Sequence, residues 1–299
     1  MTDSQPLPDL IPSWRRALRA ANRSERTIDS YLLAADQLTE YLESQGLSLA
    51  ASDVEADHIR GFLSHVLDTR ASATARQRYA SLKQMFKWLE EEGEIPVDPM
   101  ARVKPPKVVE QPVPVLSDQD LAALIKVCDG KRFVDRRDDA IVRLFIDSGM
   151  RLGELSRLTT DDVDLDLEVA VVLGKGRRLR SVPFGKSTTR VLDRYLRVRR
   201  SHKQADQSWL WLGLKGRLSD SGIEQMIARR AEAAGLGRVN PHRFRHTFAH
   251  RWLAAGGTEG DLQRIAGWQS PQMLARYGAS AAEQRARDAH RRLGLGDQL

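Results

Sequence analysis

Two segments of the first hundred residues carry apolar positions at the period of an α-helix. The first, SERTIDSYLLAADQLTEYLESQG, begins at Ser24 and ends at Gly46. Its apolar residues follow an i, i+4, i+7, i+11 spacing that places them on one helix face: Tyr31, Ala35, Leu38 and Leu42. Ser24 is a favoured N-cap and Gly46 a favoured helix stop, so the segment predicts one amphipathic helix.

A second helix is predicted over residues 72–92. Its apolar face is formed by Tyr79, Leu82, Phe86 and Leu89. A neighbouring face carries cations at i, i+7 and i+11: Arg76, Lys83 and Lys87. A charged face of this kind is most often simply solvated, but the spacing also suits a helix that follows the phosphates of a nucleic acid.

Prolines mark a boundary in the chain. Six of the twelve fall between positions 96 and 114, in a stretch without helical period. Proline-rich segments are extended and act as spacers between domains. We therefore expect a helical domain over residues 1–107, a linker over 108–114 and a second domain over 115–299.

The second domain combines helical and strand patterns. SDQDLAALIKVC and RRDDAIVRLFIDSG have the caps and periods of helices, whereas LDLEVAVVLGKGRRLRSVPF alternates like two strands around a Gly174-Lys175-Gly176 turn. From Thr188 onward the period is helical almost to the end. The chain as a whole is therefore expected to be mainly α with a small antiparallel β-sheet.

Positive charge is concentrated in the second domain. The 299 residues include 47 Lys and Arg against 40 Asp and Glu, a formal net charge of +7. Residues 1–107 hold 14 basic and 16 acidic residues, for −2, so residues 108–299 hold 33 and 24, for +9. A basic domain favours a polyanionic partner such as nucleic acid.

Other features narrow the class of protein. No apolar run approaches 18 residues, and no basic and apolar signal follows Met1, so we expect neither membrane insertion nor secretion. Cys128 is the only cysteine, which excludes an intrachain disulfide and fits a reducing cytoplasm.

The sequence lacks several familiar catalytic and metal-binding motifs. The acidic residues between Asp161 and Glu168 lack the glycine of a calcium loop. The turn at Lys175 is too short for a phosphate-binding loop and lies between strands rather than before a helix. No GxSxG elbow occurs. We therefore predict neither a metal site nor a nucleotide triphosphatase.

Arg151 follows a glycine break in DSGMRLGELSRL and stands one helical turn before Glu154. The two side chains are spaced for a surface ion pair. An arginine held by a carboxylate beside a helix N-terminus is also a good phosphate receptor, because the planar guanidinium matches two phosphate oxygens.

The segment NPHRFRHTFAHRW places histidines and an arginine at the start of another helix. Pro241 begins this helix, and His242, Arg245 and His246 share one face. One histidine on a helix is usually structural, but this cluster at a positive helix end is more typical of phosphate binding or proton transfer. A zinc site at His242 and His246 is disfavoured, because Arg243 stands where HExxH enzymes have glutamate.

Tyr277 lies nine residues after Trp268, in RIAGWQSPQMLARYGAS. The other tyrosines fall on or beside apolar helical stripes, where core packing accounts for them. Tyr277 precedes Gly278 and closes a predicted helix, so packing explains it less well. A structural role is still the commoner explanation for a single tyrosine of this kind.

Together these motifs resemble the tyrosine recombinase (phage integrase) family. They occur in the order SGMRLGEL, GKGRRLRSVPF, HRFRHTFA, AGW and a tyrosine nine residues on. The helical first domain also resembles that family's core-binding domain, so the resemblance covers about residues 12–293. It implies a core-type DNA-binding domain followed by a tyrosine-recombinase catalytic domain.

The resemblance implies a role for each motif residue. Arg151 and Arg245 would clamp the scissile phosphate of DNA. Lys175 would be the general acid, His242 the first residue of the HxxR motif, and Tyr277 the nucleophile that forms a 3′-phosphotyrosine. Since that phosphotyrosine conserves the energy of the broken bond, no cofactor is implied.

Trp268 stands where most members of the family have histidine. An indole N–H can donate a hydrogen bond to a phosphate oxygen but cannot shuttle a proton, so acid–base work would fall to Lys175 and His242. Glu154 would hold Arg151 in place. The cations of the helix over residues 72–92 would contact DNA.

The resemblance also implies partners and a cellular role. The substrate would be paired double-stranded DNA recombination sites, bound by a homotetramer in the cytoplasm of a bacterium or a phage-infected host. Accessory DNA-bending or directionality factors are further partners that such enzymes use. Integration and excision are the expected function, and resolution of chromosome or plasmid dimers is the alternative.

Two rival classes share the same features. A type IB topoisomerase uses the same chemistry but relaxes DNA as a monomer. A catalytically silent DNA-binding protein would keep the fold without the reaction.

Overall fold

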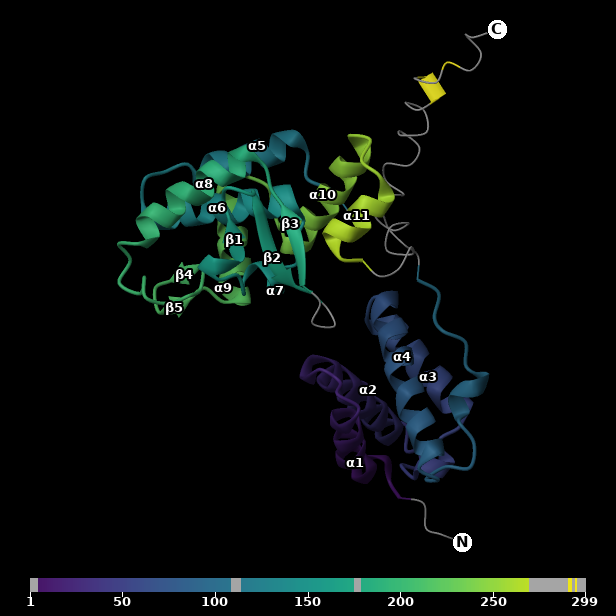
Figure 1. Ribbon diagram of the computed structural model, residues 1–299. Coiled ribbons are helices and arrows are strands. Elements are labelled where there is room, and N and C mark those ends of the chain that lie inside the picture. Colours follow the sequence, from purple (N-terminus) through teal and green to yellow (C-terminus); the bar gives the residue numbers. More distant parts are fainter. Residues whose placement is uncertain (1–4, 109–113, 175–178, 269–289, 292–293, 295–299) are drawn as a thin grey trace. The chain divides into compact units, whose positions relative to one another are not determined.

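The computed structural model describes residues 5–108, 114–174, 179–268, 290–291 and 294 (Figure 1). The chain divides into two compact units, Met1–Gln111 and Pro112–Leu299, which are called unit 1 and unit 2. Among the described residues, no helix is both long and apolar enough to cross a membrane.

Unit 1 is helical. Its elements are α1 (Leu7–Ala20), α2 (Glu25–Ser44), η1 (Ala51–Asp53), α3 (Ala56–Thr69), α4 (Ser72–Glu91) and η2 (Pro99–Arg102). Helix α2 packs against α1 and α4, and α3 packs against α4. The two amphipathic helices predicted from the sequence are thus α2 and α4.

The ends and faces of α2 and α4 follow the predicted pattern. The Ser24 hydroxyl accepts a hydrogen bond from the Thr27 N–H at 3.2 Å and caps α2, and Gly46 follows its end with a φ of +66°. The predicted apolar faces lie in the core of unit 1, with only Tyr31 half-buried; it stacks on Trp14 at 5.8 Å between ring centroids.

Unit 2 is mainly helical with small antiparallel sheets, which confirms the predicted fold class. Its elements are α5 (Asp118–Cys128), α6 (Phe133–Ser148), α7 (Leu152–Leu155), η3 (Thr160–Asp162), β1 (Val163–Asp164), β2 (Val169–Leu173), β3 (Leu179–Pro183), α8 (Lys186–Arg199), β4 (Leu212–Gly213), β5 (Gly216–Arg217), α9 (Asp220–Ala233), α10 (Pro241–Ala254) and α11 (Glu259–Ala266). Strands β1, β2 and β3 form one sheet in that order, and β2 pairs with β3 through Leu173 opposite Leu179.

One prediction for unit 2 was wrong. The chain after Thr188 was expected to be helical almost to the end, yet β4 and β5 form a two-stranded ribbon between α8 and α9. Gly216 has a φ of +122°, which only glycine adopts readily. This turn residue interrupts the apolar run before it can continue as a helix.

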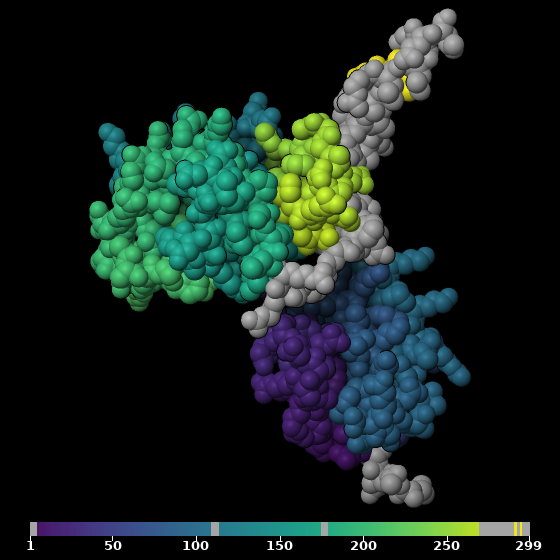
Figure 2. All heavy atoms as spheres, in the orientation of Figure 1, coloured from purple at the N-terminus to yellow at the C-terminus, as the bar shows by residue number. Residues whose placement is uncertain are grey.

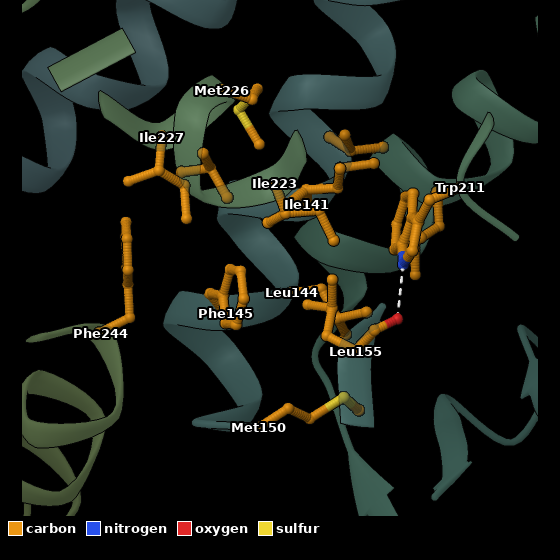
Figure 3. Packing of buried hydrophobic residues seen from close by; sticks show 14 of the residues in the cluster. Ile141, Leu144, Phe145, Met150, Leu155, Trp211, Ile223, Met226, Ile227 and Phe244 are labelled. Atoms are coloured by element: carbon orange, nitrogen blue, oxygen red, sulfur yellow. Dashed lines mark hydrogen bonds between the residues drawn. The ribbon is translucent and has the colours of Figure 1, made fainter. Parts of the chain in front are cut away.

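The core of unit 2 surrounds α6 (Figure 3). Phe145 of α6 stacks on Phe244 of α10 at 5.5 Å between ring centroids, and the Trp211 indole N–H donates to the Leu155 carbonyl at 2.9 Å. The first contact packs α10 against α6, and the second joins α7 to the segment that precedes β4. In the space-filling view, α10 and α11 lie together at one end of unit 2 (Figure 2).

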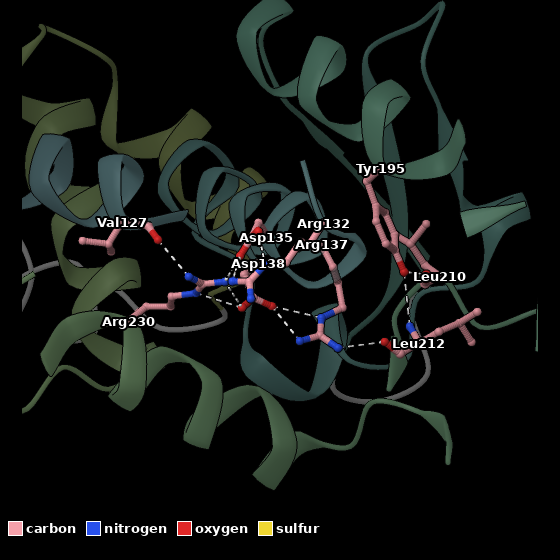
Figure 4. Close-up of polar contacts among 9 residues, drawn as sticks. All are labelled: Val127, Arg132, Asp135, Arg137, Asp138, Tyr195, Leu210, Leu212 and Arg230. Carbon is pink, nitrogen blue, oxygen red and sulfur yellow. Dashed lines mark hydrogen bonds and ion pairs between the residues drawn. The ribbon is translucent and has the colours of Figure 1, made fainter. Parts of the chain in front are cut away.

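A buried ionic network joins α6 to α9 (Figure 4). Arg230 contacts the carboxylates of Asp135 and Asp138 at 3.0 and 2.8 Å. Arg137 pairs with Asp138 and donates to the Leu212 carbonyl at 3.0 Å. Hydrogen bonds from Arg132, opposed by burial and assisted by Arg230, lower the pKa of Asp135 to about 2. The network therefore holds α9 against α6, the helix that ends directly before the Arg151 segment.

Candidate active site

The segment that carries Arg151 is shaped by the glycine before it. Gly149 ends α6 with a φ of +57°, so the chain reverses and Arg151 becomes the N-cap of α7. Its backbone N–H donates to Glu154 Oε2 at 2.9 Å and its Nη1 donates to Glu154 Oε1 at 2.8 Å. The predicted Arg151–Glu154 pair is therefore present, and about a third of the Arg151 side chain (34%) remains exposed.

Arg245 enters the same region from α10. Its side chain is buried, with 2% of its surface exposed, and its Nη1 donates to the Gly149 carbonyl at 2.8 Å. Its guanidinium carbon lies 5.1 Å from the centroid of the Trp268 ring. A cation above an indole face is stabilised by the ring quadrupole, so Trp268 and Gly149 hold Arg245 from two directions.

The carboxyl end of α11 gathers these arginines. The Ala266 carbonyl accepts from Arg245 Nη2, and the next carbonyl, that of Gly267, accepts from Arg151 Nη2 at 3.1 Å. The last carbonyls of a helix lack partners within the helix and carry the negative end of its dipole. They therefore attract guanidinium groups, and α11 brings together two arginines that stand 94 positions apart in the sequence.

Glu154 is shared with a third arginine. Arg180 of β3 donates from Nη1 to Oε1 at 2.9 Å and from Nη2 to Oε2 at 2.8 Å, while its Nε donates to the Ile265 carbonyl at 2.9 Å. Burial raises the pKa of Glu154, but hydrogen bonds from Arg180 and Arg151 outweigh it and hold that pKa at about 2. Glu154 is therefore ionised at neutral pH.

The predicted histidine cluster lies on the first turns of α10. Asn240 caps this helix by accepting from the Arg243 N–H at 3.1 Å, and Pro241 is its first residue, as the sequence indicates. His242 is exposed, whereas His246 is buried with 8% of its surface exposed. Their rings meet edge to face at 5.7 Å between centroids, on the helix that also carries Arg245.

Two predicted site residues fall outside the described residues. They are Lys175, between β2 and β3, and Tyr277, after α11. Their assignment remains a prediction, as does the helical period expected for the end of the chain.

The predicted DNA-contacting cations lie on α4 in unit 1. Arg76, Lys83 and Lys87 are all exposed, and Lys87 pairs with Glu91 at 3.4 Å. Arg78 of the same helix is buried and donates from Nε to Gln37 at 2.6 Å, so it stabilises unit 1. The exposed face is thus separate from the arginine that holds α4 to α2.

The acidic segment that begins in η3 has structural roles in the described part of the chain. Asp162 accepts from the Thr159 N–H at 2.7 Å, and Asp164 accepts from the Leu167 N–H at 2.8 Å. Within the described ranges, no group of three or more His, Cys, Asp or Glu side chains is placed to hold a metal ion.

Arg180 and Gly149 were not singled out from the sequence. Arg180 lies 26 positions after Glu154, so no helical spacing relates the two. The sequence placed Gly149 directly before the Arg151 motif, but the pattern there indicated only that a helix is interrupted. The roles of Arg180 and Gly149 both depend on contacts between segments that are distant in the sequence.

Comparison with known proteins identifies the class. Residues 114–284 match the phage integrase family, and residues 10–93 match the N-terminal SAM-like domain of phage integrases. A tyrosine recombinase XerC of Myxococcus xanthus is 30% identical over 280 residues, which are 91% of this chain and 93% of the relative.

Solved structures share the fold. The XerH site-specific recombinase bound to a palindromic difH substrate has a TM-score of 0.75 at 18% identity, covering 91% of this chain and 81% of that one. The integrase of the Tn1549 transposon in complex with transposon right end DNA has a TM-score of 0.73 at 20% identity, covering 97% and 99%.

The chain belongs to the phage integrase family of tyrosine recombinases. It is a site-specific recombinase, an enzyme that breaks and rejoins DNA strands, and this interpretation of the sequence is confirmed.

Proposed function

We propose that this recombinase cleaves DNA through Tyr277 and forms a 3′-phosphotyrosine, with Arg151 and Arg245 bound to the scissile phosphate. The observation that carries the proposal is the placement of both guanidiniums on successive carbonyls at the end of α11. Two cations held in this way meet the charge that develops on the nonbridging oxygens during attack.

The phenol oxygen of Tyr277 attacks phosphorus, and the bond from phosphorus to the 5′-oxygen breaks. Lys175 donates a proton to that leaving oxygen, and His242 accepts the proton of the phenol. The indole N–H of Trp268 donates to a nonbridging oxygen, and Glu154 keeps Arg151 oriented. A 5′-hydroxyl from another strand then attacks the phosphotyrosine, releases Tyr277 and joins the strands.

Unit 1 supplies binding to the DNA backbone through Arg76, Lys83 and Lys87 of α4, whose exposure supports this role. We assign residues 1–107 to a core-type DNA-binding domain, 108–114 to a linker and 115–299 to the catalytic domain. Two recombination sites are held together by a homotetramer in the cytoplasm. A lambda integrase tetramer bound to a Holliday junction has the same fold, which supports that assembly. Accessory DNA-bending or directionality factors complete the expected set of partners.

Integration or excision of a mobile element is the function we assign. A second candidate is the resolution of chromosome or plasmid dimers, which is favoured by the 30% identity to tyrosine recombinases XerC over most of the chain. Mapping covalent cleavage positions in genomic DNA distinguishes them: sites at the borders of a mobile element support the first, and one site in the host chromosome or a plasmid supports the second.

A nicked suicide substrate tests the chemistry. The wild type should accumulate a covalent protein–DNA adduct, and Tyr277→Phe should form none. No adduct with wild type, or an adduct with Tyr277→Phe, contradicts the assignment of the nucleophile. Lys175→Ala should be slow on ordinary DNA and recover on a 5′-bridging phosphorothiolate, because a thiolate leaves without a proton.

A plasmid with two sites separates the rival classes. A recombinase gives exchanged products from two sites, whereas a type IB topoisomerase changes only the supercoiling of the plasmid. A silent DNA-binding protein gives neither.

A further inference from the structure

The carboxylate of Glu154 lies between two guanidiniums. Arg180 binds both of its oxygens, and Arg151 binds Oε1 through its side chain and Oε2 through its backbone. The exposed fractions of the Glu154 and Arg180 side chains are 6% and 14%, so solvent screens this interaction little. One negative charge is thus divided between two buried or half-buried cations.

Because Glu154 is shared between Arg180 and Arg151, the positive charge of Arg151 is only partly neutralised. A carboxylate paired with one arginine neutralises it and competes with a phosphate for the same N–H groups. When a second arginine takes both carboxylate oxygens, the three charges leave a net +1 beside the exposed edge of Arg151. That net charge is available to an anion.

Arg180 is itself held tightly. Its Nε donates to the Ile265 carbonyl, which joins β3 to the end of α11. A Cβ at Gly267 would lie 3.1–3.2 Å from the Arg180 guanidinium, so the glycine leaves just enough room for that side chain. Arg180, Arg245 and Arg151 thus contact three successive carbonyls, those of Ile265, Ala266 and Gly267.

We infer that Arg180 is a positioning residue for Arg151: it shares Glu154, which fixes the Arg151 guanidinium and leaves its positive charge free for the scissile phosphate. This inference rests on the proposed function. It gives Arg180 a role in the reaction without contact with DNA.

A DNA substrate whose scissile linkage is uncharged distinguishes a positioning role of Arg180 from a merely structural one. In a methylphosphonate, a methyl group replaces one charged nonbridging oxygen, so the reaction needs less positive charge from the enzyme. Arg180→Met should slow adduct formation on ordinary DNA by on the order of 100-fold, the cost typical of a misplaced catalytic group. On a suicide substrate with methylphosphonate at the scissile position, the loss should be much smaller.

Arg217→Met is the matched control. Arg217 also holds the α7 region, because its Nε donates to the Ser156 carbonyl at 3.1 Å. Among the described residues, its other polar contacts are with Ser156 Oγ, Asp220 and the Trp209 ring, and not with Glu154. Any loss in Arg217→Met should be equal on the two substrates. A pure folding defect in Arg180→Met would likewise give equal losses.

Two further variants keep the test decisive. Glu154→Gln combined with Arg180→Met removes the carboxylate that would otherwise neutralise Arg151, so the double variant should be faster than Arg180→Met alone. Arg180→Lys keeps the charge but cannot bind both oxygens, so its rate should be intermediate; it replaces Arg180→Met if the latter fails to fold.

Equal losses on the two substrates for Arg180→Met, or for Arg180→Lys in its place, would overturn the inference, as would a normal rate on ordinary DNA. Both results require a wild type that forms the Tyr277 adduct. If the wild type forms none, the proposed function itself fails, and this is a separate outcome.

Discussion

Gly149 packs directly under the ring of Phe248: a Cβ at residue 149 would stand 2.4 Å from Phe248 Cδ1. The same glycine has a φ of +57° and accepts from Arg245 through its carbonyl. Its lack of a side chain therefore serves the turn before Arg151, the packing of α10 and the anchoring of Arg245.

Replacement of this glycine should be costly. Gly149→Ala adds both backbone strain and an overlap with Phe248, so we expect a loss of about 1–3 kcal/mol from overpacking in addition to about 1–2 kcal/mol from the left-handed backbone. Gly256→Ala is the control, because Gly256 has a φ of +85° with no atom within 4 Å of its Cβ position. Thermal unfolding should show the larger loss for Gly149→Ala; equal losses would contradict the packing argument.

Trp268 should contribute to stability and to catalysis through different atoms. Trp268→Phe keeps an aromatic face against Arg245 but removes the N–H that we assign to a phosphate oxygen. Loss of a hydrogen bond to a charged group costs about 1.5–3 kcal/mol, so adduct formation should fall by about 10- to 100-fold with little change in unfolding temperature.

Trp268→Ala provides the comparison. It removes the ring from the cluster formed by Phe248, Leu253 and Leu262, and loss of a buried tryptophan costs about 3–5 kcal/mol. Its unfolding temperature should therefore fall clearly. If Trp268→Phe keeps the wild-type rate of adduct formation, the indole N–H has no part in the reaction.

Acid should destabilise unit 2 through Glu154. Because its folded pKa of about 2 lies below its ordinary value of 4.5, the unfolded state binds the proton more tightly. The stabilisation, on the order of 3 kcal/mol, is present above pH 4.5 and is lost as the pH falls toward 2. Asp135, with a pKa of about 2, adds to the effect in the same range.

Urea unfolding at a series of pH values from 7 to 3 measures this dependence. Glu154→Gln should be less stable than wild type at pH 7, because Arg180 loses its partner, but should depend less on pH below 5. Glu232→Gln at an exposed position should follow the wild type. An unchanged slope in Glu154→Gln would contradict the assignment.

The sequence predicted those features of the site that depend on near neighbours. The pair of Arg151 with Glu154 follows from a spacing of three residues, and the start of α10 follows from Asn240 and Pro241. The grouping of arginines at α11 could not be predicted, because Arg180 and Ile265 are 85 positions apart and no local pattern relates them. Likewise, β4 and β5 form because Gly216 allows a turn where apolar residues alone indicated helix.

Cys128 should be unreactive in the folded protein. It is 1% exposed at the end of α5, and burial raises the pKa of its thiol to about 12, so neither access nor thiolate is available at pH 8. A thiol reagent should modify native protein far more slowly than protein in urea, and more slowly than a Ser201→Cys variant at an exposed position. Rapid labelling of the native wild type would show that α5 opens readily.

The cations of α4 should determine the salt dependence of DNA binding independently of the chemistry in unit 2. Each phosphate contact that is lost should reduce the slope of log K against log salt by about 0.9. Arg76→Gln and Lys83→Gln should each show this reduction. The effect of Lys87→Gln should be smaller, because Glu91 already partly neutralises Lys87.

Arg16→Gln on α1 is the control for general charge, and Tyr277→Phe should keep the wild-type slope because its phenol carries no charge before cleavage. Titrations by fluorescence anisotropy at several salt concentrations measure these slopes, and an equal change for Arg16→Gln and Lys83→Gln would contradict a specific DNA-binding face on α4.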